Sequence, residues 1–118
     1  MPNDITFEQL NTASNNDSDI GADICSITGD LITIDVKALT GKTFTGLTDA
    51  GVLQMMFRLR KLAGDAQALA NDGVPDDEQL NSFPPFSYAP PTPEGIININ
   101  QVQDMVIKIS TANITGIN

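Results

Sequence analysis

The sequence predicts a single α+β domain, residues 1–118, in which a small antiparallel sheet or hairpin packs against one long amphipathic helix. Two patterns support this fold class. Hydrophobic residues recur every three or four positions over residues 49–71, and they alternate with polar residues over residues 31–39. A third feature is the position of the prolines, six of which lie within residues 74–95 and indicate a proline-rich extended arm.

The long helix is expected from Asp49 to Asn71. Its apolar stripe consists of Val52, Met55, Leu59, Leu62, Ala66 and Leu69. Thr48 or Asp49 is expected to cap the first turn, and Gly73 is expected to end the helix. Gly64 in the middle predicts that another segment approaches the helix backbone closely. That segment is either a strand or loop of the same domain, which is the favoured interpretation, or a partner helix in an oligomer.

A strand region is expected over residues 24–39. The Thr-Gly-Asp sequence at residues 28–30 is typical of a turn, which would join a first strand at residues 23–27 to a second at residues 31–39. The alternation predicts a buried face made by Ile32, Ile34, Val36 and Ala38.

The N-terminal residues predict a short helix followed by a loop. Thr6 and Gln9 have the spacing of a capping box, so a helix is expected within residues 2–13. Residues 14–23 are dense in acids and amides and are expected to form an acidic polar loop in solvent.

The proline-rich arm, residues 74–95, has two interpretations. It is either a docking peptide for an aromatic groove of another protein or a structural strap over the domain's own core, and the strap is favoured. The strap would place on the core the three aromatic residues Phe83, Phe86 and Tyr88. A C-terminal element is expected over residues 96–112. A helix capped by Asn98 or Asn100 is favoured narrowly over a strand at residues 105–110.

The charges are unevenly distributed along the chain. The net charge is −9, yet residues 37–61 alone carry a balance of +4 and the rest of the chain −13. Either acidic loops fold over the basic segment, which is the favoured interpretation, or the basic patch meets an acidic surface of another copy or another protein. The candidate contact residues are Arg58, Arg60, Lys61, Asp76, Asp77 and Glu78. The negative net charge disfavours nucleic acid as a partner.

The residue types that are absent exclude most catalytic chemistry. The chain has no histidine and one cysteine, so Ser-His and Cys-His nucleophiles, zinc cages and iron–sulfur clusters are excluded. Cys25 is expected to be a buried structural thiol. We expect no catalytic residue, no cofactor and no metal ligand. Two alternatives stay open: a carboxylate site that combines Asp35 with Asp76, Asp77 or Glu78, and a divalent-cation site at Asp17, Asp19 and Asp23.

The function expected from the sequence is therefore a noncatalytic protein–protein interaction or assembly module, which self-associates as a homo-oligomer or binds a partner protein. No apolar run approaches 18 residues, so no membrane span is expected. The first residues show no signal-peptide pattern, and with a single cysteine this predicts a cytoplasmic location.

Overall fold

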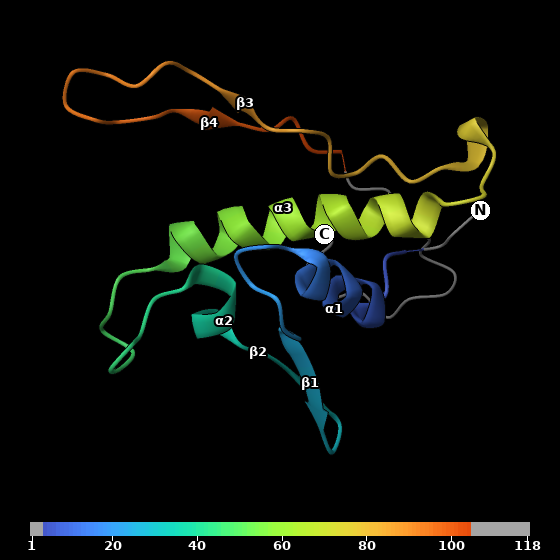
Figure 1. Ribbon diagram of the computed structural model, residues 1–118, viewed down its shortest axis with the longest axis horizontal. Helices are drawn as coiled ribbons and strands as arrows, with labels where there is room; N and C mark the ends of the chain where they lie inside the picture. Colours follow the sequence, from blue (N-terminus) through green and yellow to red (C-terminus); the bar gives the residue numbers. More distant parts are fainter. Residues whose placement is uncertain (1–3, 105–118) are drawn as a thin grey trace, which may run out of the picture.

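The computed structural model describes residues 4–104. The elements in chain order are α1 (Phe7–Asn16), β1 (Cys25–Thr28), β2 (Leu31–Ile34), α2 (Val36–Thr40), α3 (Val52–Asn71), the 3-10 helix η1 (Asp76–Glu78), β3 (Ser87–Tyr88) and β4 (Ile99–Asn100). Helix α3 runs through the middle of the molecule (Figure 1). The β3–β4 hairpin and the arm lie on one side of α3, while α1, α2 and the β1–β2 hairpin lie on the other. This arrangement confirms the predicted α+β class.

The core lies between α3 and the elements that precede it in the chain. Its buried cluster consists of Ala13, Ile24, Cys25, Leu39, Leu62 and Ala66. The predicted stripe of α3 is thus confirmed at its centre, where Leu62 and Ala66 are buried and Leu59 is half-buried. The stripe is exposed at its two ends, at Val52 and Leu69, because no described segment covers them.

Helix α3 begins at Val52, three residues later than expected. The residues before it form a turn in which the Asp49 carboxylate accepts hydrogen bonds from the backbone amide and the hydroxyl of Thr45. Asp49 is therefore engaged outside the helix, and the prediction that Thr48 or Asp49 caps α3 is wrong. Gly51 holds the N-cap position without a side-chain hydrogen bond.

The β1–β2 hairpin is confirmed, with Cys25 opposite Ile34 and Thr28 opposite Leu31. The turn residue Gly29 adopts a left-handed conformation with φ of 64°. The second strand is shorter than predicted, since the Asp35 carboxylate accepts a hydrogen bond from the Ala38 amide at 3.0 Å and starts α2 there. The chain therefore turns away from the strand at residue 35.

The prediction that the second strand has a buried face is also wrong, because the chain leaves the strand at residue 35 and the hairpin beyond Cys25 does not pack on the core. Ile32 and Ile34 are exposed, and Val36 and Ala38 belong to α2, where they are half-buried. Only the start of the hairpin, at Cys25, reaches the core. The rest of the hairpin projects away from α3 (Figure 1).

The N-terminal helix is confirmed together with its capping box. The Gln9 amide donates to the Thr6 hydroxyl at 3.1 Å, and the Thr6 amide donates to the Gln9 side chain at 2.9 Å. The helix continues to Asn16, so the start of the predicted loop is helical. Ser14 is fully buried there, and its hydroxyl donates to the Ala22 carbonyl at 2.7 Å. This bond holds the following loop against α1.

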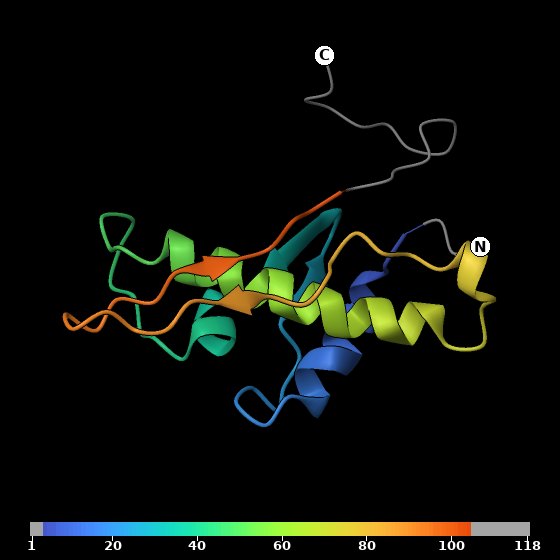
Figure 2. The ribbon, with the colours of Figure 1, turned by 90° about the horizontal axis from the view of Figure 1, so that it is seen from above.

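The arm lies along α3, as Figure 2 shows from above, so it packs on its own domain. It lies on the side of α3 opposite the core cluster, however, so the expectation that it would place its aromatic residues on the core is wrong. The Phe83 carbonyl would lie 3.4 Å from a Cβ atom at Gly64, so the close approach predicted at this glycine is made by a segment of the same domain. The Phe86 ring packs edge-on against Phe57 of α3, with ring centroids 5.0 Å apart. Tyr88 remains exposed, in β3.

The C-terminal element differs from the prediction within the described residues. Tyr88 pairs with Ile99 and Ser87 with Asn100, so residues 99–100 form a strand. Residues 101–104 are not helical, and the predicted helix start at residues 98–100 is wrong. The alternative strand at residues 105–110 lies outside the described residues.

Candidate functional site

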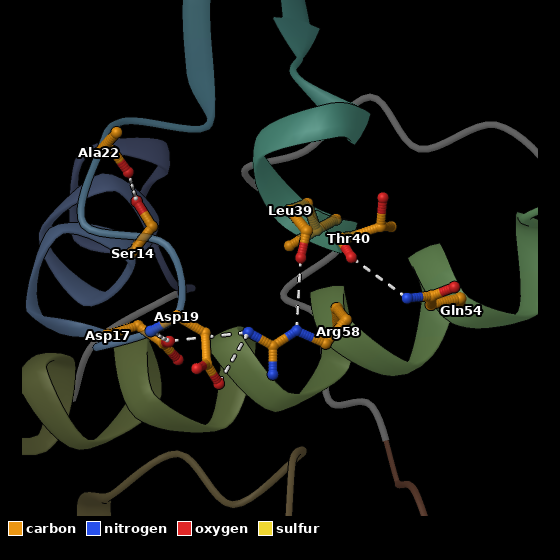
Figure 3. A network of polar contacts seen from close by, with 8 residues as sticks. All are labelled: Ser14, Asp17, Asp19, Ala22, Leu39, Thr40, Gln54 and Arg58. Carbon is orange, nitrogen blue, oxygen red and sulfur yellow. Dashed lines mark hydrogen bonds and ion pairs between the residues drawn. The ribbon is translucent and has the colours of Figure 1, made fainter. Parts of the chain in front are cut away.

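Arg58 joins three parts of the fold (Figure 3). Its Nε donates to the Leu39 carbonyl of α2 at 3.3 Å, and its Nη2 lies 3.6 Å from Asp17 and 3.9 Å from Asp19 in the loop after α1. The side chains of Arg58 and Asp17 are only 15% and 13% exposed. At this position the acidic loop does fold over the basic segment, as one of the two interpretations of the charge distribution expected.

Arg60 and Lys61 lie in a different environment, beside the arm. They line an open groove of about 450 Å³ between α3 and the arm. The arm contributes Phe83, Pro84, Pro85, Phe86 and Tyr88 to the groove. Within residues 4–104, neither basic side chain has a hydrogen bond or an ion pair. Both charges are therefore available to an outside group.

The acidic candidates Asp76, Asp77 and Glu78 lie in η1, where all three are exposed. This short helix follows the C-terminal end of α3, whereas Lys61 lies ten residues before that end, a distance of about 15 Å along the helix. The structure does not bring the predicted acidic and basic contacts together. Asp35, the proposed carboxylate partner of this cluster, caps α2 instead.

Cys25 is buried, as predicted. Burial raises the pKa of the Cys25 thiol, and the nearby Asp23 carboxylate raises it further, so the thiol stays protonated and weakly nucleophilic at neutral pH. No group of three or more cysteine or acidic side chains in the described part of the chain is placed to hold a metal ion. Asp17 and Asp19, two of the candidate cation ligands, face Arg58 instead.

Sequence reasoning missed the surface formed by the β1–β2 hairpin. The strand register places Cys25, Ile27, Ile32 and Ile34 on one face of the hairpin. A groove of about 340 Å³ lies between this face and α1, where Phe7 borders it. The alternation in the sequence identified Ile32 and Ile34 as members of an apolar face. It carried no signal that the face would remain uncovered.

Exposed hydrophobic side chains also occur on two other parts of the fold. At the start of α3 and in the loop before it they are Leu47, Val52, Leu53 and Met56. On and around the β3–β4 hairpin they are Tyr88, Ile96, Ile97, Ile99 and Val102. No described segment covers these side chains.

No helix within residues 4–104 has both the length and the apolar character needed to cross a bilayer. Comparison of the chain with protein-family models, with curated proteins and with solved structures gave no match.

Proposed function

We propose that this protein is a noncatalytic interaction or assembly module that self-associates or binds a partner protein. The observation that carries the proposal is the amount of exposed hydrophobic surface. Among the described residues, fifteen large hydrophobic side chains are exposed, whereas eight hydrophobic side chains are buried. Contiguous apolar patches on a protein surface are typical of sites that bind other macromolecules.

The charges support a protein partner. Arg60 and Lys61 lie beside aromatic and proline side chains of the arm, a surface suited to an acidic segment of another copy or another protein. Such charges mainly increase the association rate and fix orientation. A net charge of −9 repels phosphate groups, so the proposed partner is neither a nucleic acid nor an anionic membrane. We also propose a cytoplasmic location, with which the single cysteine is consistent.

The alternative functions have no supporting observation in the described residues. A carboxylate-based enzyme or ligand site would require Asp35 to face the acidic residues of η1, but Asp35 caps α2. A divalent-cation site at Asp17 and Asp19 would have to displace Arg58 from both carboxylates.

The test is the mass of the protein in solution, measured by light scattering across protein concentration at about 0.05 and 0.5 M salt, where the screening length differs about threefold. We expect a species larger than the monomer that persists at high salt. Reversal of Arg60 and Lys61 together (R60E/K61E) should weaken association at low salt only.

The matched control reverses Lys37 and Lys42 (K37E/K42E). This variant has the same change in net charge, and both residues are exposed and outside the groove. Equal effects of the two variants would contradict a specific role of the groove. A strict monomer at every concentration would contradict self-association and restrict the proposal to a partner protein.

A further inference from the structure

The β1–β2 hairpin has one apolar and one largely polar face. Ile27 lies opposite Ile32 and Cys25 opposite Ile34, so these four side chains share one face. The other face consists of Ser26, Thr28, Leu31 and Thr33. The hydroxyls of Ser26 and Thr33 are 2.8 Å apart across the strands, which confirms that these two side chains lie on the same side. The hairpin has the pattern of a sheet that covers a core on one side.

The described residues, 4–104, cover only one end of this apolar face. Cys25 is buried against the core, but Ile27, Ile32 and Ile34 are 70%, 44% and 37% exposed. A two-stranded hairpin is marginally stable unless its apolar face packs against something. Figure 1 shows the hairpin pointing away from α3, and among the described elements α1 borders one side of its apolar face.

We propose that this face is the interface between two copies of the chain, related by a twofold axis. The inference rests on the proposed function and specifies the contact through which self-association occurs. A twofold contact places the Ile27–Ile32 pair of one copy on the same pair of the other, as two sheets pack with their inner faces interdigitated. Phe7 of α1, which is half-exposed beside the hairpin, extends the contact.

The area available indicates how tight this dimer is. Phe7, Ile27, Ile32 and Ile34 together expose roughly 400 Å² per copy, taking about 200 Å² for a fully exposed large side chain. With the surrounding backbone and polar atoms, two copies bury on the order of 1,000 Å², close to the lower limit for a specific interface. The dimer is therefore expected to form and dissociate with protein concentration.

Carboxylates at the edge of the apolar hairpin face determine the salt concentration at which the test is made. Glu8 borders the groove and Asp30 lies in the hairpin turn, so a twofold contact brings like charges of the two copies near one another. At about 0.5 M salt these charges, and those of Arg60 and Lys61, are largely screened. Dimer affinity measured there reports on the apolar contact.

The experiment is sedimentation equilibrium at about 0.5 M salt on the full chain and on three variants. Ile27→Thr with Ile32→Thr removes the apolar pair but keeps β-branched residues that favour strands. We expect this variant to weaken dimerisation at least tenfold. Leu31→Thr, which removes an exposed hydrophobic side chain from the opposite face of the same hairpin, should change the dissociation constant less than twofold.

Phe7→Ala is the third variant, since it removes apolar surface without altering the hairpin and alanine favours the helix. It should weaken dimerisation severalfold. The inference would be overturned if the Ile27→Thr/Ile32→Thr and Phe7→Ala variants dimerised as tightly as the unaltered chain. It would also be overturned if the unaltered chain were monomeric. An oligomer that responds to R60E/K61E at about 0.05 M salt, but to none of the hairpin variants at either salt concentration, would overturn the inference and leave the proposed function intact.

Discussion

At the scale of single residues, three amide side chains connect segments that have no regular pairing with one another. The Asn11 amide bonds the backbone N–H and C=O of Cys25, at 2.8 and 2.9 Å. Gln67 bonds both groups of Phe83, and Asn71 bonds both groups of Leu80. A carboxamide can do this because it presents one donor and one acceptor side by side, like a peptide group.

Arg58 has a structural role that can be tested by mutation. We expect Arg58→Ala to lower the free energy of unfolding by about 1–3 kcal/mol, because the Leu39 carbonyl loses a charged donor and the poorly exposed Asp17 carboxylate loses its cation. Urea denaturation measures the change. Lys61→Ala, on the exposed surface of the same helix, serves as the control and should stay within about 0.5 kcal/mol. Equal stability of the two variants would contradict this role.

The turn before α3 is expected to respond to acid. The hydrogen bond from the Thr45 amide lowers the pKa of Asp49 below its ordinary value of 3.8. A carboxyl group with a lowered pKa in the folded state stabilises that state above its ordinary pKa, and this contribution is lost as the pH falls through the lowered value.

An NMR titration of the Thr45 amide should therefore show a midpoint below pH 3.8, and the transition should be absent in Asp49→Asn. A midpoint at or above 3.8 would show that the turn does not favour the charged carboxylate.

At the scale of elements, α3 serves as the support for everything else. One side packs against α1 and α2 through the core, and the opposite side holds the arm through Gln67 and Asn71, one helical turn apart. Proline has no amide hydrogen, so the arm is held at Leu80 and Phe83, residues that retain theirs. The arm is thus extended because of its prolines, and its position is determined by amides on α3.

Asn71 provides the test of this attachment. In Asn71→Ala the N–H and C=O of the buried Leu80 lose their partner, and we expect the attachment of the arm to weaken by about 1–3 kcal/mol. Hydrogen exchange of the Leu80 amide should accelerate accordingly. Asn81→Ala, at an exposed neighbouring position, is the control. Unchanged exchange at Leu80 in the Asn71 variant would show that other contacts hold the arm.

At the scale of the whole molecule, the core formed by residues 4–104 is small beside the hydrophobic surface that these residues expose. The described core lies on one side of α3, and both two-stranded sheets leave apolar side chains exposed. Association that covers these side chains would stabilise the folded chain, because binding to the folded state alone shifts the unfolding equilibrium. In the proposed assembly, folding stability and association are therefore linked.

The sequence by itself determined the features that depend on neighbouring residues. Periodicity identified the central part of α3, the capping box identified α1, and the Gly29 turn identified the hairpin. Boundaries were less predictable where a side chain had a competing local partner. Asp49 bonds Thr45 instead of capping α3, and Asp35 starts a helix where the hydrophobic alternation still favours a strand.

Only the tertiary structure decided which surfaces are covered and which polar groups meet. Of the three basic residues predicted as contacts on α3, Arg58 is engaged inside the fold, while Arg60 and Lys61 face the groove. The hairpin face that the pattern marked as buried is exposed beyond Cys25. The physical reason is that alternation and charge specify the chemistry of a face, whereas its partner is set by how segments distant in the sequence come together in space.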